Sequence, residues 1–468
     1  MDNLEEDLNK HVDDQANRYL EKYKPYVETL ESNSIISRVR SVRSADVMAL
    51  GKMLESWENV LRLCEADGSV SDLGILPKIA LDVITVAYGT SPLALIATTQ
   101  PIEEELGTVY YKKVTAKNTA GNRTAADKMV DVETGMGTIS KGYAGAFVSA
   151  ESVGTGDAST VTFTPTLANI PVRAGTVKIT AGAIIATDVN QDGKLHGVGI
   201  ADLSTINYTT GAVSIVYTTA PANALAITAD YTASLEAMSD INAIGTELTT
   251  KSVRAHPYAL KGTIGMLKSY ALRKRFGTVA EDELALDLIN MINSEIFGDA
   301  VRKMVTAQTG NTTWSKTVPS GISEYEHRMS FKYKLAATET VIVSNAGRGN
   351  RSFYVAGRNV CEYMSTQPGW VQLYDGNSIS GGHLYGTLDG VPVIRIPSDT
   401  TVLDADKAVV GFKGLSNFEA PVAYAPYMPL TVTGMLPMTN PLNSQRAAAS
   451  WVAVEVLVSE FLTGFEMT

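Results

Sequence analysis

TVAEDELALDLINMINSEIFGDAVRKMVTAQTG, residues 278–310, holds a single helical pattern over its whole length. Thr278 and Glu281 have the capping-box form, in which a Thr hydroxyl accepts from the first free amides and a Glu reaches back. Apolar residues then recur every three or four positions up to Gly310, namely Leu284, Leu288, Ile292, Ile296, Ala300 and Met304. About 28 helical residues at 1.5 Å each make a rod of about 40 Å. Such a rod is long for a globular domain and suits a structural spine.

A shorter basic helix is predicted before this rod. The helical signal returns after Ala255, continues through Ile264, Leu267 and Leu272, and ends at Gly277. Its neighbourhood carries five cations, Lys261, Lys268, Arg273, Lys274 and Arg275. Cations in a last helical turn suit the helix dipole. We therefore expect a salt-bridged interface between copies or a solvated face, with a nucleic-acid contact as the alternative.

Residues 1–65 are predicted to be helical. One apolar stripe is interrupted at Pro25 and consists of Leu4, Leu8, Val12, Ala16, Tyr19 and Tyr23. A second steps 4-3-4-3 like a short coiled-coil seam, through Leu50, Leu54, Trp57, Leu61 and Cys64. Two interpretations fit: helices packed as their own domain, or a helical extension that docks on copies of itself or on another protein.

Residues 66–113 are predicted to be extended. Gly74-Ile75-Leu76-Pro77 opens an apolar run, and Gln100-Pro101 ends it before the strand-like Thr108-Val109-Tyr110-Tyr111.

Residues 114–235 are predicted to be an inserted all-β module of sandwich or small-barrel type. Only 16 of these residues are charged and 20 are Thr, which favours pleated, half-buried surface. Apolar residues alternate at Val213–Tyr217 and Leu225–Tyr231. Asp192-Gly193 and Thr210-Gly211 are turn signals between such runs.

The remaining chain mixes helix and strand. Residues 236–319 contain the basic helix and the rod, and residues 320–408 combine a helix with short strands, including a hairpin at Leu388-Asp389-Gly390-Val391. Residues 409–468 read as strands with Pro-rich loops. The predicted class is α+β with an all-β insertion.

Composition narrows the function classes. The 468 residues are 19% charged, with a net charge of −11 and two cysteines. The acidic balance argues against a protein that coats nucleic acid, and two cysteines exclude a disulfide scaffold and fit a reducing compartment. Neither a secretory signal nor a membrane-spanning segment is expected. The low charged fraction indicates surface that partners cover.

Catalytic and metal-binding patterns are sparse. The five dispersed histidines have no catalytic spacing and are interpreted as surface or structural residues; they are His11, His196, His256, His327 and His383. Gly347-Arg348-Gly349-Asn350 lacks the Lys and Ser/Thr of a phosphate loop and is interpreted as a turn. We predict no catalytic residues and no cofactor.

One string is similar to the first half of a calcium loop. Asp188, Asn190 and Asp192 occupy positions 1, 3 and 5, and Gly193 occupies position 6. The twelfth position, which needs a bidentate Glu, is Gly199. A polar hairpin turn is therefore the preferred interpretation.

From Gly74 onward the chain resembles the major capsid proteins of tailed phages, which have the HK97-like fold, and the myovirus-type branch most. The blocks that carry the resemblance occur in the family's order: Ile84–Tyr111, Lys251–Lys261, the basic helix and the rod with Ser294-Glu295-Ile296, Val410–Gly414 and Tyr424–Leu430. The family's Gln-Pro-Met-x-Gly-Pro-x-Gly stretch is replaced by Gln100-Pro-Ile-Glu-Glu-Glu-Leu-Gly107.

The resemblance implies a role for each segment. Residues 66–113 would be the N-arm and the start of the E-loop, which reaches over a neighbouring subunit, and residues 114–235 would interrupt that loop. Residues 236–319 would hold the E-loop return and the peripheral domain with its spine helix. Residues 320–408 would be the axial domain, and residues 409–468 would add C-terminal strands to both domains.

The resemblance also implies proteolytic processing. In this family the N-terminal helical segment can be an internal scaffold that a prohead protease removes after a Leu/Ile-x-Glu site. Leu63-Cys64-Glu65, followed by Ala66, fits this pattern at the composition boundary. Three other matches are Leu4–Glu6, Ile102–Glu104 and Ile322–Glu324.

The sequence therefore predicts a non-enzymatic shell subunit that forms hexamers and pentamers around double-stranded DNA, in a virion capsid assembled in the host cytoplasm. Scaffold, prohead protease, portal and decoration proteins are the partners that the resemblance implies, and no membrane is involved. An encapsulin-like shell or a tail component remains an alternative, as does a β-rich carbohydrate enzyme or adhesin.

Overall fold

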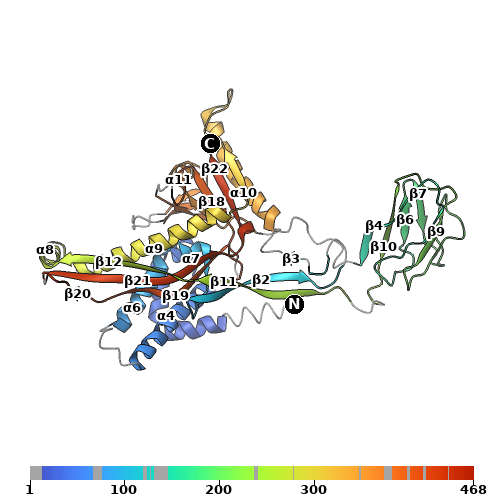
Figure 1. The fold of residues 1–468 in the computed structure, drawn as a ribbon. Coiled ribbons are helices and arrows are strands. Elements are labelled where there is room, and N and C mark those ends of the chain that lie inside the picture. Colours follow the sequence, from blue (N-terminus) through green and yellow to red (C-terminus); the bar gives the residue numbers. More distant parts are fainter. Residues whose placement is uncertain are drawn as a thin grey trace. The chain divides into compact units, whose positions relative to one another are not determined.

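The computed structural model describes residues 13–66, 76–119, 124–126, 128–130, 146–236, 241–277, 279–346, 349–373, 382–397, 401–414, 418–440 and 442–468. They fall into two compact units (Figure 1). Unit 1 draws on Met1–Lys112, Asp131–Gly137 and Leu248–Thr468, and unit 2 on Lys113–Val130 and Thr138–Glu247. The predicted α+β class is confirmed, because long helices and separate, largely antiparallel sheets share the chain.

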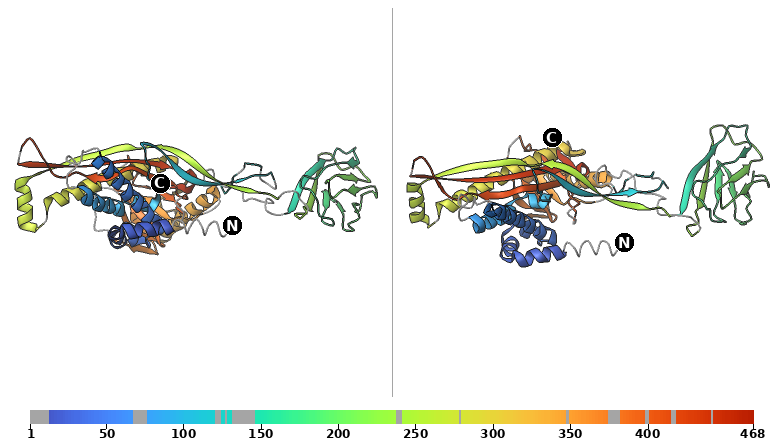
Figure 2. Two further views of the ribbon diagram at one scale, coloured as in Figure 1. Left: turned by 90° about the horizontal axis from the view of Figure 1, so that it is seen from below. Right: turned by 60° about the horizontal axis from the view of Figure 1, so that its bottom comes forward.

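The first sheet of unit 1 carries the predicted rod. Its strand order is β1 (Ala97–Thr99), β19 (Val422–Val432), β21 (Asn443–Val456) and β12 (His256–Gly265), and β20 (Leu436–Pro437) also pairs with β21. Helix α9 (Ala280–Ala307) packs against β12 and β21 (Figures 1 and 2). The predicted apolar stripe is its buried face, from Leu288 to Met304.

Helix α9 begins directly after Val279, whose side chain makes no cap hydrogen bond. The predicted capping residue Thr278 lies outside the described residues. Glu281, Asp282 and Glu283 in the first turn place negative charge at the positive end of the helix dipole.

The basic helix is shorter than predicted. Residues 256–265 are strand β12, which pairs with β21 from His256–Val452 to Gly265–Asn443, and α8 covers only Met266–Phe276. Tyr258 and Leu260 pack on the core with the period of two of a strand. The end of α8 is confirmed, because Gly277 adopts a left-handed φ of 70°.

The described part of the N-terminal segment, from residue 13 onward, is helical, as predicted, but it is not a domain of its own. After a helix at residues 13–22 come α2 (Lys24–Asn33), α3 (Ile35–Val39) and α4 (Ser44–Ala66). The predicted break at Pro25 is confirmed, since Pro25 stands in the first turn of α2. The described stripe residues belong to the same hydrophobic cluster as α9 and β19. The interpretation as a separate domain is therefore corrected, because the segment packs on the core of its own chain.

The predicted extended conformation is wrong for residues 76–96. They form α6 (Leu76–Thr90) and the short α7 (Leu93–Ile96). Val83, Ile84, Thr85, Ala87 and Tyr88 are all buried. This side of α6 packs on α2, α4, α9 and β19, while Asp82 is exposed. A short, mostly apolar run of this kind cannot be told from a buried strand by its sequence pattern alone.

The chain leaves unit 1 and returns to it along two long strands. β2 (Leu106–Ala116) and β11 (Ile244–Arg254) are neighbours in a three-stranded sheet with β3 (Lys128–Val130).

The second sheet of unit 1 has seven strands and its own core. In order these are β13 (Asn311–Trp314), β22 (Leu462–Met467), β18 (Lys407–Gly411), β14 (Phe353–Ala356), β17 (Val391–Arg395), β16 (His383–Leu388) and β15 (Trp370–Gln372). Helices α10 (Glu324–Ala346) and α11 (Arg358–Ser365) and the 3-10 turn η1 (Ser459–Phe461) belong with it. The predicted hairpin is confirmed, with Asp389 and Gly390 both at positive φ.

Unit 2 contains the predicted β module. One sheet has the order β4 (Phe147–Thr155), β10 (Ala226–Thr232), β6 (Lys178–Ala181) and β7 (Ile184–Thr187). The other has β5 (Thr162–Phe163), β9 (Val213–Val216) and β8 (Thr205–Ile206). Both predicted alternating runs are strands, and Ile215, Ile227 and Tyr231 lie in one core.

The burial of α9 can be tested with a neighbouring pair of residues. Ile292 is 2% exposed and Met291 is 51% exposed. We expect Ile292→Ala to lower the free energy of unfolding of unit 1 by about 2–5 kcal/mol, because it leaves a cavity in the core. Met291→Ala should change it by less than about 0.5 kcal/mol. Urea unfolding followed by Trp fluorescence reports on unit 1 alone, since all four Trp lie there; equal effects of the two substitutions would contradict this packing.

Candidate processing and assembly sites

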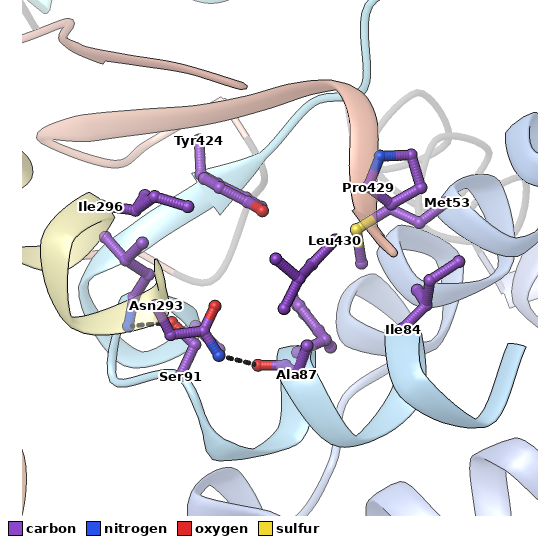
Figure 3. Close-up of a pocket in the computed structure, with 12 residues that line it drawn as sticks. Met53, Ile84, Ala87, Ser91, Asn293, Ile296, Tyr424, Pro429 and Leu430 are labelled. Carbon is purple, nitrogen blue, oxygen red and sulfur yellow. Dashed lines mark hydrogen bonds between the residues drawn. The ribbon is translucent and has the colours of Figure 1, made fainter. Parts of the chain in front are cut away.

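The N-terminal helices meet α6, α9 and β19 around a small cavity (Figure 3). Met53 of α4, Ile84 of α6, Ile296 of α9 and Leu430 of β19 line it. Asn293 Nδ2 of α9 donates to the Ala87 carbonyl oxygen of α6 at 3.0 Å. The cavity measures about 20 Å³, room for about one water molecule. It is therefore a packing gap between the N-terminal segment and the rest of the core, too small for a ligand.

A buried ion pair fixes the turn between α3 and α4. Asp46 is 5% exposed and accepts from the two terminal guanidinium nitrogens of Arg40, Nη1 and Nη2, at 2.7 and 3.1 Å. Its carboxylate also accepts from the backbone N–H of Arg43 at 3.0 Å. These contacts satisfy the buried charge, as a charge in a low-dielectric setting requires.

Lys413 lies near this pair and holds α7 in place. Its Nζ donates to the carbonyl oxygens of Ala94, within α7, and Ala97, directly after it, at 2.8 and 2.7 Å. Burial lowers the pKa of Lys413 to about 8; Asp46 acts in the opposite direction, and Arg40 adds to the lowering. Lys413, in the loop after β18, therefore interacts electrostatically with Asp46 and Arg40 of the N-terminal segment.

The predicted cleavage position lies at the end of α4. The Glu65–Ala66 bond is in the last turn of that helix, where helices fray. Of the competing matches, Leu4–Glu6 lies outside the described residues and Ile102 is buried. Ile322 is exposed, and Glu324 begins α10.

The calcium-like string forms a turn. The Asp188 carboxylate is buried and accepts from the backbone amides of Gly175 and Val177, at 2.8 and 2.9 Å. Asp192 pairs with His196, 3.1 Å from its Nε2. Among the described residues no group of three or more His, Cys, Asp and Glu could hold a metal ion.

The described histidines lie on separate elements, and the residues of the predicted basic cluster are divided between two. His327 stacks on Trp314 and its Nε2 donates to the Ser315 carbonyl oxygen, while His256 and His383 stand on β12 and β16. His11, Gly347 and Arg348 lie outside the described residues. Lys261 lies on β12, so only the other four cations of the predicted cluster share α8.

A charged groove beside α9 has no sequence motif. Lys303 Nζ donates to Glu455 Oε1 and to the Val454 carbonyl oxygen, both at 2.7 Å. Tyr258 donates to Asp299, and burial, together with this bond, raises the pKa of the phenol. These residues come from α9, β12 and β21, so only the folded sheet brings them together.

No described helix is both long enough and apolar enough to cross a membrane.

The family model described as "Major capsid protein Gp23" matches residues 79–451. A major capsid protein of Vibrio phage KVP40 is 26% identical over 213 residues, which is 41% of this chain and 41% of that protein. The matched segment thus spans less than half of the relative.

Solved structures give low scores. The asymmetric unit of the bacteriophage PhiM1 mature capsid has a TM-score of 0.30 at 9% identity, covering 50% of this chain and 77% of that one. The capsid of Myoviridae phage XM1 gives 0.29 at 9%, with 50% and 81% covered. A virus-like particle from Pyrococcus furiosus gives 0.30 at 10%, with 47% and 81% covered. TM-scores of about 0.3 are too low to support a conclusion about the fold or the function of this chain.

The lowered pKa of Lys413 predicts a pH dependence of stability. Between about pH 8 and pH 10 the folded chain has released this proton while the unfolded chain still holds it. The unfolded state then binds more protons, so the stability of unit 1 rises with pH in this window. Lys413→Met should remove a rise on the order of 1 kcal/mol.

The measurement is urea unfolding by Trp fluorescence at pH 7, 8, 9 and 10. The matched control is Lys52→Met, at an exposed position on α4. Parallel pH profiles for the wild-type chain and Lys413→Met would contradict this account.

Proposed function

This chain belongs to the family of the major capsid protein Gp23 and is a structural capsid protein, and from that premise we propose that its copies form hexamers and pentamers enclosing double-stranded DNA. The observation that carries the proposal is the family match, which extends over residues 79–451.

The physical character of the chain supports this role. A shell needs extended contacts between identical copies and a rigid element that keeps the subunit's shape. The 28-residue α9 and the 14-residue β21 are such elements. A net charge of −11 would keep the wall from gripping DNA that must be packed and later released. No enzymatic activity is part of this proposal.

We assign the segments as follows. β2, β11 and unit 2 belong to the loop that reaches over a neighbouring subunit. α9 is the spine of the peripheral domain, and the seven-stranded sheet with α10 and α11 is the axial domain. The HK97-like arrangement that these names imply is part of the proposal.

We further propose that a prohead protease cuts between Glu65 and Ala66. Removing residues 1–65 would take away Leu50, Leu54 and Trp57, which are buried in the core shared with α6 and β19. Cleavage would therefore require the face of α6 to be covered again or to rearrange, because a large exposed apolar surface is unfavourable.

The remaining partners in the proposal are scaffold, portal and decoration proteins. Assembly would take place in the host cytoplasm, and the finished subunit would reside in the virion capsid.

Self-assembly can be tested on the expressed full chain. We expect size-exclusion chromatography to separate capsomer-sized or larger particles from the 50.0 kDa chain. Negative-stain microscopy should then show rings of five or six subunits or closed shells. A stable 50.0 kDa monomer at all concentrations would overturn the proposed function.

Processing can be tested in mature particles by mass spectrometry. We expect peptides that begin at Ala66, and we expect Glu65→Gln to abolish them because the motif requires Glu before the cut. Glu104→Gln alters the competing match at Ile102–Glu104 and should leave cleavage unchanged. Intact peptides that span Glu65 and Ala66 in mature wild-type particles would refute the cut.

A further inference from the structure

Helix α8 exposes its apolar side chains to an unusual degree. None of its 11 residues is buried. Its five large apolar side chains are 38% to 76% exposed, namely Met266, Leu267, Tyr270, Leu272 and Phe276. An isolated helix of fewer than about 12 residues is marginal in water and needs a packing partner. In the described part of its own chain α8 contacts its sequence neighbours β12 and α9, and these contacts leave its five large apolar side chains exposed.

The charges of α8 are also unmatched. Lys268, Arg273, Lys274 and Arg275 give it four positive charges, and it contains no acidic residue. None of these cations forms an ion pair with another residue that the structure describes. Lys274 lies 6.0 Å from the Tyr270 ring, so the cationic and aromatic groups share one surface. Figure 1 shows α8 at the end of β12, where the Met266 amide donates to the Leu442 carbonyl oxygen.

A complementary surface lies on the outer face of α9. Glu283, Asp287, Met291 and Glu295 are all exposed, and their spacing of four puts them in one row along the helix. Leu286, 44% exposed, lies beside this row. Within the described residues the three carboxylates form no ion pair, and none is matched to the cations of the chain's own α8. This acidic-apolar row mirrors the basic-apolar character of α8.

We propose that α8 of one copy docks on the row Glu283–Asp287–Met291–Glu295 of α9 in a second copy. The proposal rests on the proposed self-assembly and names a surface for it. Two different patches meet, so the contact is head-to-tail and can close a ring. Apolar groups of α8 would bury against Leu286 and Met291 while its cations face the three carboxylates.

A second copy fits α8 better than nucleic acid does. Contacts to a duplex go mainly to phosphates, through cations and polar groups. Those contacts would leave Leu267 and Phe276 without an apolar partner. The surface of α9 offers carboxylates for the cations of α8, and it offers Leu286 and Met291 for the apolar side chains of α8.

The test is a charge swap in the full chain. Arg273→Glu with Arg275→Glu, or Glu283→Arg with Asp287→Arg, should each raise the concentration needed for assembly about tenfold or more. All four substitutions in one chain should restore assembly, because the swapped patches attract again. Lys178→Glu with Lys194→Glu, exposed in unit 2, changes the net charge as much as the α8 pair and should leave assembly unchanged.

Two further measurements complete the test: one uses a variant that lacks two apolar side chains of α8, and the other measures binding to a DNA duplex. Leu267→Ser with Phe276→Ser should weaken assembly with no loss of unit 1 stability by Trp fluorescence, because both side chains are exposed in the single chain. Assembly of the α8 variants at the wild-type concentration would overturn the inference and leave the proposed function standing. A wild-type chain that never assembles would overturn both. If Arg273→Glu with Arg275→Glu weakens binding to a DNA duplex while assembly stays normal, these cations contact nucleic acid and the inference fails.

Discussion

The packing of α9 on the sheet of β12 and β21 is the constraint on which the rest of unit 1 depends. Ile292, Ile296 and Met304 are almost fully buried in one cluster with β19 and the N-terminal helices. Strands from residues 256–265, 422–432 and 443–456 must therefore come together before α9 has a surface to cover. A helix whose amphipathic face is satisfied only by distant segments draws its stability from tertiary packing rather than from local propensity.

The same cluster explains why the N-terminal segment belongs to the fold. Tyr23, Leu30 and Leu54 fill space against α6, and α6 in turn contacts α9 and β19. The Arg40–Asp46 pair and Lys413 add charges that are held by specific partners inside this region. The buried charges must stay paired to be tolerated, which restricts how the segment can shift without being released.

Elements with one buried and one exposed face could be predicted from the sequence, and elements without that contrast could not. α9 and the strands near Ile215 and Ile227 show their periods because solvent and core alternate along them. α6 is mostly apolar and mostly buried, with Asp82 exposed, and a short apolar run of this kind has the same sequence pattern as a buried strand. Lys261 and Ile264 are predicted to lie on the basic helix, whereas pairing with β21 places both on strand β12. The proximity of Lys413 to Asp46 could not be predicted from the sequence, because 367 positions separate the two residues and no motif links them.

Two helices show how differently one chain can treat apolar surface. α4 carries Leu50, Leu54 and Trp57, and its own chain buries all three. α8 carries Leu267, Tyr270 and Phe276, and none of them is buried. Burial of a large apolar side chain is worth about 1.5–3 kcal/mol, so leaving three of them in water forfeits stability that the subunit could otherwise have. Burial of the same side chains between copies would offset that loss. The physical logic that makes α4 part of the subunit therefore makes α8 part of a contact between subunits.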